Sequence, residues 1–222
     1  MRDIRQFDRP DQDVLDAFWE HTPATLNAAL GRNGAMDPAI RPLSLGMRVC
    51  GPAVTAALHG ADNLMVHVAL AVAQPEDVLV VDARGIDDAA AWDDVMTAAA
   101  QVRAISGLVV DGAVRTASVI RAVHFPVFAR GATVNAMPSA APTGAVNVAI
   151  LCGGVRVCPG DIVVGDDDGV TVIPRNEAGA VLERARRWEK MEEDFRRRVV
   201  EGATTIELLN LSAALAKAGI EL

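Results

Sequence analysis

Two neighbouring acids and one arginine have the spacing of side chains that can meet in one site. Asp93 and Asp94 lie near the start of a predicted helix, and Arg115 follows the apolar segment GLVVD. The 20 residues between Asp94 and Arg115 are about what a helix, a turn and a strand need to return the chain to the same edge of a sheet. A carboxylate and a guanidinium that face one cleft are suited to moving protons and binding anions. The helix dipole also favours paired acids at a helix start, so a purely structural role stays open.

The segment before Arg115 has the form of an anion site. GLVVD predicts a strand over residues 107–111, and residues 113–123 are predicted to form the next helix. A strand that ends in Asp111 and Gly112 would leave free backbone N–H groups and Arg115 at a helix N-terminus, a combination that attracts a carboxylate or phosphate. The alternative is that Asp111 caps the helix and Arg115 makes a surface ion pair.

Several familiar kinds of active site are excluded by what the sequence lacks. It contains no GxxxxGK[ST], GxGxxG, GxSxG or HExxH motif, so nucleotide, dinucleotide, serine-hydrolase and zincin sites lack their required parts. The 3 cysteines form no metal-binding spacing and are interpreted as small buried side chains, and the 4 histidines are scattered. The lysines are Lys190 and Lys217, both near the C-terminus, which argues against a Schiff-base enzyme. Any metal is therefore expected to be held by oxygen ligands.

Size and charge narrow the class of protein further. The chain has 222 residues, of which 51% are hydrophobic, enough for one compact domain. A net charge of −8 disfavours nucleic acid as a partner, because the phosphate backbone attracts cationic proteins. The first residues are charged and no apolar stretch of about 18 residues occurs, so neither a signal peptide nor a membrane span is predicted. We expect a cytoplasmic protein.

The apolar pattern predicts alternating helices and strands, followed by antiparallel strands. Helices are expected over residues 12–31, with a break at Thr22 and Pro23, and over 62–73, 89–102 and 113–123; strands are expected over 46–58, 77–82, 107–111 and 127–130. After a loop at 134–146, short apolar runs separated by glycine-containing turns predict antiparallel strands up to residue 174. Together these elements predict an α/β fold in a single domain, 1–222, with an N-terminal helical layer at 1–40, a core at 45–174 and C-terminal helices at 176–222.

Two charged segments have structural interpretations. Residues 165–169 (GDDDG) place three acids between two strands, which is typical of a turn and lacks the spacing of a calcium-binding EF-hand loop. The helix over residues 183–198 is strongly charged and is interpreted as a solvated face. The alternative is that this helix docks on a neighbouring subunit of an oligomer.

Several segments together resemble one known family. VVDARG (80–85), AWDDVMTAAA (91–100), GLVVDGAVR (107–115), FPVFARG (125–131), VNVAI (146–150) and VRVCPGDIVVGDDDGVTVIP (155–174) are similar to segments of the 4-hydroxy-4-methyl-2-oxoglutarate/4-carboxy-4-hydroxy-2-oxoadipate aldolase family, which includes the regulator of ribonuclease activity A. The resemblance extends from about residue 45 to residue 174. It implies an α/β/β sandwich of the swivelling-domain type with mixed sheets, assembled as homotrimers or hexamers with active sites between subunits.

The resemblance implies a divalent-metal-dependent lyase that cleaves a 4-hydroxy-2-oxo acid to pyruvate, decarboxylates oxaloacetate, or does both. The family pattern is an acid, 20 residues, an arginine and then an aspartate, and Asp94 and Arg115 match it. Thr116 stands where the family has the aspartate that binds Mg²⁺ or Mn²⁺, and Asp93 stands where a glycine is common. A divalent ion would therefore depend on Asp94, Thr116 and Asp93, or on Asp111, and its affinity is expected to fall.

Roles for the other site residues also come from the resemblance. Arg115 would neutralise charge on the keto or enolate group, and Asp94 would hold the water that acts as base. The backbone N–H groups of Asp94, Val95 and Met96 would receive the substrate carboxylate. Glu192 lies near the position of a catalytic glutamate that family members lend to the neighbouring subunit's site.

Two other interpretations stand beside the lyase. Thr116 favours a non-catalytic, regulator-like protein that binds a protein partner, and an acidic chain would suit a basic RNA-processing partner. An enzyme with an altered substrate, working without a metal, would also explain Asp93 and Thr116. Asn63 and His67 match a further segment of the family, although His67 is interpreted as a packed helix residue.

Overall fold

A mixed sheet forms the centre of the protein. The computed structural model describes residues 6–140 and 143–220, so residues 1–5 of the predicted N-terminal layer, 141–142 of the predicted loop and 221–222 of the predicted C-terminal helices lie outside the described residues. Four parallel strands lie side by side in the order β5 (Val127–Ala132), β4 (Gly107–Val114), β3 (Val78–Trp92) and β2 (Val49–Leu58). The antiparallel strands are β1 (Arg41–Pro42) beside β5, β6 (Gly144–Val146) and β9 (Ile162–Asp166) beside β2, and β10 (Gly169–Ile173) beside β9.

Strand β2 joins two parts of the sheet because it changes partner along its length. Residues 53–57 pair in parallel with β3, whereas residues 49–52 pair antiparallel with β9. Gly51 lies where β2 passes close to the Glu76 carbonyl, and a Cβ at this position would be 2.2 Å from that oxygen. A glycine is required by this approach. The one or two strands predicted over residues 46–58 are thus one strand shared by both parts.

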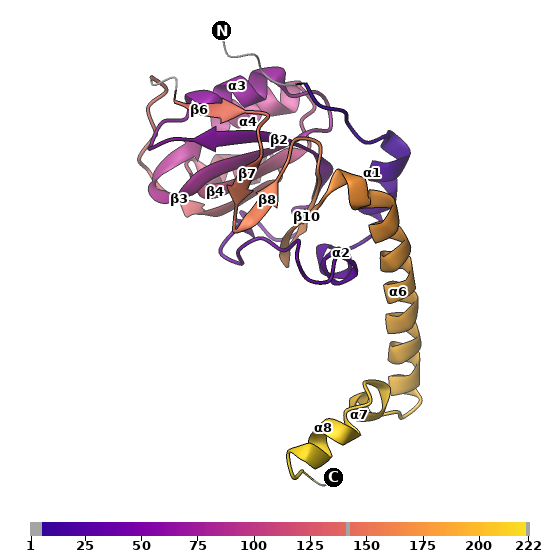
Figure 1. The fold of residues 1–222 in the computed structure, drawn as a ribbon. Helices are drawn as coiled ribbons and strands as arrows, with labels where there is room; N and C mark the ends of the chain where they lie inside the picture. The colour runs from indigo at the N-terminus through magenta and orange to yellow at the C-terminus, as the bar shows by residue number, and fades with distance from the viewer. Residues whose placement is uncertain (1–5, 141–142, 221–222) are drawn as a thin grey trace.

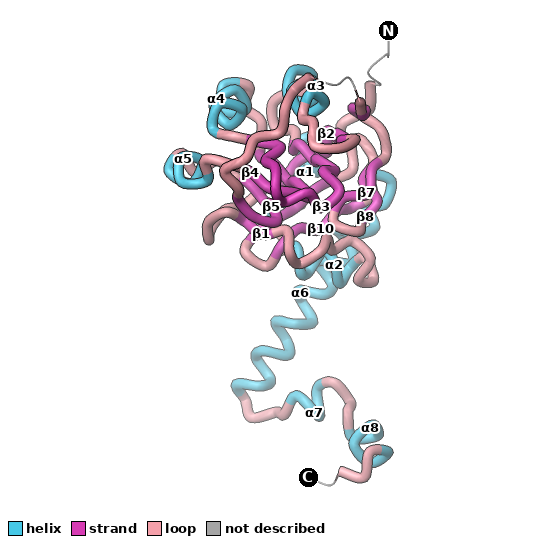
Figure 2. The backbone as a smooth tube through the Cα atoms, turned by 90° about the vertical axis from the view of Figure 1, so that its left-hand side faces the viewer, coloured by secondary structure: helices cyan, strands magenta, loops and turns pink. Residues whose placement is uncertain are grey.

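Helices cover one face of the parallel strands and further strands cover the other. The helices are α3 (Leu64–Val72), α4 (Asp94–Val102) and α5 (Ala117–Ala122), which Figure 2 shows outside the sheet. On the opposite face lie β9, β10 and the hairpin of β7 (Ile150–Cys152) and β8 (Val155–Val157). In β3, Leu79 and Val81 face the helices while Val78 and Val80 face the second layer of strands. This three-layer α/β/β arrangement confirms the predicted fold class.

A third hydrophobic cluster lies outside β9 and β10. It is formed by α1 (Gln12–Trp19), α2 (Pro23–Ala29) and the first turns of α6 (Ala178–Val200), which follows the short 3-10 helix η1 (Arg175–Glu177). In β9, Val163 faces the inner layer while Ile162 and Val164 pack against these helices. The predicted N-terminal helices therefore cover the second layer of strands, and the break at Thr22 is the N-cap of α2.

Most of α6 extends away from the three layers. The buried residues of this 23-residue helix, about 35 Å long, lie in its first turns and end at Ala185. Figures 1 and 2 both show the rest projecting from the sheet, with α7 (Thr205–Leu208) and α8 (Ser212–Lys217) beyond its end. Within this chain the charged segment 183–198 is thus mainly solvated, as predicted. Among the described residues, no helix combines the length and apolarity needed to cross a bilayer.

Helix α4 begins later than the helix predicted over residues 89–102. The preceding strand continues through three alanines to Trp92, and Ala90 stays in the sheet because it pairs with Ala113 of β4. Alanine has a high intrinsic helix propensity, but strand pairing overrides it here. The result is that Asp93 and Asp94 stand at the end of the strand and at the start of the helix.

Candidate active site

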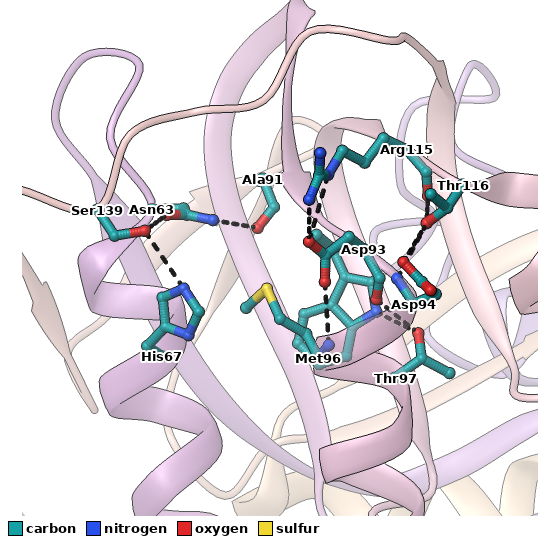
Figure 3. A network of polar contacts seen from close by, with 11 residues as sticks. Asn63, His67, Ala91, Asp93, Asp94, Met96, Thr97, Arg115, Thr116 and Ser139 are labelled. Atoms are coloured by element: carbon teal, nitrogen blue, oxygen red, sulfur yellow. Dashed lines mark hydrogen bonds and ion pairs between the residues drawn. The ribbon is translucent and has the colours of Figure 1, made fainter.

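The acids and the arginine meet because β3 and β4 end side by side. Trp92 is paired with Val114, and the Arg115 N–H donates to the Trp92 carbonyl over 2.9 Å. The next residues on each strand, Asp93 and Arg115, therefore face one another at the carboxyl ends of parallel strands, the usual place for ligands in open α/β sheets (Figure 3). The sequence predicted this meeting for Asp94 and Arg115, with 20 residues between them. In the structure the carboxylate that contacts Arg115 is that of the neighbouring residue, Asp93.

Asp93 makes the strongest contacts of the site. Its Oδ2 accepts from Arg115 Nη2 at 2.7 Å and from Nε at 3.2 Å, while its Oδ1 accepts from the Met96 N–H at 3.0 Å, which makes Asp93 the N-cap of α4. Burial raises the pKa of Asp93, but hydrogen bonds from Met96 and Arg115 outweigh it, and the pKa of this carboxyl lies below its usual value. Asp93 is therefore a carboxylate, bound by an arginine and a helix N-terminus.

Asp94 and Thr116 form a second pair beside it. The Thr116 hydroxyl has two acceptors within reach, Asp94 Oδ1 at 3.0 Å and the Arg115 carbonyl at 2.7 Å. The same hydroxyl oxygen accepts from the Asp94 N–H at 3.0 Å. Thr116 has φ +52°, in the left-handed region that a β-branched residue rarely adopts. The backbone at this position suits an aspartate or asparagine better than a threonine.

A buried tryptophan supports the start of α4. The Trp92 ring is 1% exposed and stacks on Phe125, with ring centroids 6.4 Å apart. Its Nε1–H donates to Thr97 Oγ1 at 2.8 Å, and the Thr97 hydroxyl donates to the Asp93 carbonyl at 2.9 Å. Two buried side chains, Trp92 and Thr97, thus hold the backbone of Asp93 in place.

Asn63, His67 and Ser139 lie beside this site in Figure 3. Ser139 Oγ donates to Asn63 Oδ1 at 2.6 Å and lies 3.3 Å from His67 Nε2, and Asn63 Nδ2 donates to the Ala91 carbonyl. His67 is exposed, so its interpretation as a packed helix residue is wrong: the ring lies on the outer side of α3, towards the 134–146 loop. Ser139 was not singled out in the sequence, since a serine in a Pro- and Ala-rich loop carries no pattern of its own.

Oxygen ligands for a metal are few at this edge. Across residues 6–140 and 143–220, no group of three or more His, Cys, Asp or Glu side chains gathers to hold an ion. Asp93 is engaged with Arg115, which leaves Asp94 and the Thr116 hydroxyl as neighbouring oxygen donors. Mg²⁺ sites in proteins often have one or two carboxylates and several waters. Asp94 supplies one carboxylate and Thr116 a neutral hydroxyl, which fits a divalent ion that is held weakly.

The remaining predicted site residues are divided between this edge and the α6 arm. Val95 and Met96 form the first turn of α4, and the Met96 N–H is occupied by Asp93. Glu192 lies on α6, where it accepts from Trp188 Nε1 at 2.8 Å and pairs with Arg196 at 3.5 Å. This chain therefore does not bring its own Glu192 to Arg115, and its role in a neighbouring subunit stays a prediction.

Asp111 does not belong to the site, which corrects two predictions. It lies inside β4, which continues to Val114, so it neither caps α5 nor joins Asp94 and Thr116 at the end of the strand. Asp111 instead pairs with Arg130 Nε and accepts from the Gly153 N–H at 2.8 Å, while Arg130 Nη2 reaches Asp37 at 2.9 Å. This half-buried network joins β4 and β5 to the β7–β8 turn. Arg130 was contained in the FPVFARG segment, but nothing in its spacing pointed to Asp111.

The turn at residues 165–169 has the predicted structural role. It closes the β9–β10 hairpin, in which Gly169 pairs with Asp166. The carboxylates satisfy backbone N–H groups: Asp166 accepts from the Asp168 N–H at 2.9 Å and Asp167 accepts from the Gly46 N–H at 2.7 Å. These acids stabilise the turn and a neighbouring loop.

The known proteins that are similar to this chain include one named as an aldolase and others named as inhibitors of RNA processing. A sequence model of the RraA-like family, described as Aldolase/RraA, matches residues 12–172. A protein of Halalkalibacterium halodurans with the provisional name 4-hydroxy-4-methyl-2-oxoglutarate aldolase is 40% identical over 194 residues, which are 87% of this chain and 92% of that protein.

Two of the solved structures similar to this chain carry the regulator name. Streptomyces coelicolor RraAS2, described as an unusual member of the RNase ES inhibitor RraA protein family, matches with a TM-score of 0.76 and 30% identity over 86% of this chain and 99% of that one. The RNA-processing inhibitor RraA from Thermus thermophilis matches with a TM-score of 0.63 and 26% identity over 68% of this chain and 92% of that one.

Proposed function

Because the chain belongs to the RraA-like (Aldolase/RraA) family, we propose that it is a lyase that cleaves a 4-hydroxy-2-oxo acid to pyruvate, decarboxylates oxaloacetate, or does both. One observation carries this proposal: Asp94 and Arg115 lie together at the carboxyl ends of β3 and β4, beside the N-terminus of α4. This edge offers positive charge for a 2-oxo acid and a carboxylate for proton transfer.

In the proposed retro-aldol reaction, one proton leaves the C4 hydroxyl of the substrate and one proton is added at C3. A base removes the proton of the C4 hydroxyl, the C3–C4 bond breaks, and its electron pair passes into the enolate of pyruvate while C4 becomes a carbonyl. Protonation of C3 then gives pyruvate. Arg115 stabilises the negative charge that develops on the enolate oxygen. Asp94 orients the water that accepts the hydroxyl proton, and the N–H groups of Val95 and Met96 bind the substrate carboxylate.

A divalent ion, Mg²⁺ or Mn²⁺, would supply further positive charge beside the 2-oxo oxygen when bound. Asp94 and the Thr116 hydroxyl are the side chains that would hold it, while Asp93 remains with Arg115. One carboxylate gives a weaker site than two, so we expect a low metal affinity.

A neighbouring subunit would complete the site. We propose a homotrimer or hexamer in which Glu192 of one chain approaches Arg115 of the next. The projecting α6 arm supports this proposal, because its charged distal half contributes no residue to the three core clusters of the described chain.

The experiment is a coupled assay of pyruvate release. Oxaloacetate and 4-carboxy-4-hydroxy-2-oxoadipate are offered with Mg²⁺, with Mn²⁺ and with EDTA, and NADH oxidation by lactate dehydrogenase reports pyruvate. We expect metal-dependent release that Arg115→Ala abolishes. Absence of release from both substrates in the wild type, with the protein folded, would refute the proposal.

Thr116 also favours a second candidate function, that of a non-catalytic regulator. A neutral hydroxyl replaces the metal-binding aspartate, and the chain is acidic with a net charge of −8. The similar structures from Streptomyces coelicolor and Thermus thermophilis are described as members of an inhibitor family. This function predicts no turnover and a salt-dependent complex with a basic RNA-processing protein, measurable by analytical ultracentrifugation.

A further inference from the structure

We infer that Asp93 is an internal competitor for the substrate carboxylate and thereby limits the affinity of this site for small 2-oxo acids. This inference rests on the proposed function, because it concerns the same binding position. It assigns to Asp93 a role in substrate selection, distinct from that of a metal ligand.

Asp93 occupies the donors that the proposed function assigns to substrate. One carboxylate oxygen takes the Met96 N–H at 3.0 Å, and the other takes Arg115 Nη2 at 2.7 Å and Nε at 3.2 Å. A helix N-terminus combined with a guanidinium is a favourable place for a carboxylate. The carboxylate found there belongs to the protein itself.

The exposure of the two side chains shows from which side an anion can reach this ion pair. The Asp93 side chain is 17% exposed, whereas Arg115 is 38% exposed, so an anion from solvent can approach the guanidinium from its outer side. Thr97 and Trp92 fix the Asp93 backbone, so displacement requires only rotation of the Asp93 side chain. A substrate carboxylate must break both sets of Asp93 contacts before it can use them.

Two carboxylates cannot use these donors together. A second anion beside Asp93 would be repelled by the charge already present and would meet a guanidinium whose Nε–H and one Nη–H are engaged. The energy that Asp93 gains from Arg115 and Met96 is therefore subtracted from the binding energy of the substrate.

An alternative role for Asp93 predicts the opposite change in anion affinity when its carboxylate is removed. If Asp93 merely positions Arg115, removal of its carboxylate disorders the guanidinium and weakens anion binding. If Asp93 competes with the substrate, removal strengthens anion binding. The direction of the change thus separates the two roles.

The backbone permits variants that remove the carboxylate and keep the helix start. Asp93 has φ −146° and ψ −175°, an extended conformation open to any residue. Glycine is well tolerated at an N-cap, and serine is itself a preferred N-cap. Asp93→Gly removes the competing side chain, while Asp93→Ser keeps a short capping oxygen and removes the negative charge.

The test is isothermal titration calorimetry with oxalate, a planar analogue of the pyruvate enolate, in the presence of EDTA. We expect Asp93→Gly and Asp93→Ser to bind oxalate about tenfold more tightly than the wild type. Arg115→Ala placed on Asp93→Gly should abolish the gain. Asp87→Asn, which removes an exposed acid of β3, is the control for net charge and should leave the affinity within about twofold.

Unchanged or weaker oxalate binding in both Asp93 variants, with their folds verified by circular dichroism, would overturn the inference. Because the titration is free of metal and of turnover, its result is independent of whether the chain is a lyase. A gain in oxalate affinity without pyruvate release would contradict the proposed function only. Pyruvate release without the gain would contradict the role of Asp93 only.

Discussion

At the scale of single residues, Thr116 and Asp93 make this site different from the family pattern. Thr116 replaces an acid and adopts a left-handed conformation, while Asp93 adds an acid that is held by Arg115. Relative to the family pattern, one carboxylate is therefore lost at position 116, where we propose that a metal binds, and one is gained at position 93, beside Arg115. Sequence reasoning located all of these residues, but it did not foresee that Asp93 would take the Met96 N–H predicted for substrate.

Thr116→Asp should create a stronger metal site. The new carboxylate would stand next to Asp94, and aspartate adopts the left-handed conformation more readily than threonine. We expect Mg²⁺ to raise the melting temperature of this variant, by an amount that corresponds to about 2.7 kcal/mol at a hundredfold excess over Kd. Differential scanning fluorimetry measures the shift. Thr116→Asn has the same shape without the charge, and an equal Mg²⁺ response in both variants would disprove the assignment.

Asp93 should stabilise the fold only where it is ionised. Its folded pKa lies below the ordinary value, so its contribution is present above the unfolded pKa of about 3.9 and is lost as pH falls through the lower folded value. Thermal unfolding of the wild type and of Asp93→Asn, compared across pH, should show a constant advantage of the wild type at neutral pH that disappears in acid. Asp87→Asn should show no such profile. A difference that persists at the lowest pH would contradict this account.

At the scale of elements, the strand ends decide which residues meet. The apolar runs at 77–82 and 107–111 correctly predicted β3 and β4, but not how far each continues. Those extensions are fixed by pairing between residues that are distant in sequence, such as Trp92 with Val114, and local propensity does not contain that information. For this reason Asp111 was expected at the site and instead lies inside the sheet.

Arg130 should matter more for stability than any exposed arginine. It holds Asp111 and Asp37 at the junction of β5, β4 and the β7–β8 turn, and the side chain of Asp111 is 10% exposed. Arg130→Ala should lower the free energy of unfolding by about 3 kcal/mol, because a buried carboxylate loses its counterion. Urea unfolding monitored by tryptophan fluorescence measures it.

The matched control is Arg196→Ala on α6. Arg196 pairs with Glu192 at 3.5 Å, but both side chains are exposed to solvent. Its loss should cost less than about 1 kcal/mol. Similar losses of stability in the two variants would show that the Asp111–Arg130–Asp37 network does not hold these strands together.

At the scale of the whole molecule, three layers are followed by an arm whose buried residues end at Ala185, although Glu189 further along it lies 2.8 Å from His21. Composition and periodicity were sufficient to predict an α/β fold, because buried strands and amphipathic helices have local patterns. The direction of the arm was not predictable from the sequence, because a charged helix has the same sequence pattern whether it is solvated or docks on another chain.

Removal of residues 203–222 should leave the three layers folded. Within the described chain, the three core clusters contain no residue beyond Ala185, so this deletion takes nothing from them. We expect an unchanged near-UV circular dichroism spectrum and a free energy of unfolding within about 0.5 kcal/mol at equal oligomeric state. Light scattering coupled to size exclusion shows whether the assembly changes. Loss of the native near-UV spectrum would mean that the three layers depend on residues 203–222.

The exchange of pyruvate methyl protons for deuterium tests the central claim most directly, because it requires the enolate but no particular aldol substrate. Proton NMR in D₂O follows the methyl signal with Mg²⁺ or Mn²⁺ and either wild type or Arg115→Ala. We expect exchange by the wild type and a loss of about a hundredfold or more in the variant, the usual effect of removing a group that stabilises developing charge. No exchange by the folded wild type, or equal exchange by both proteins, would contradict that claim.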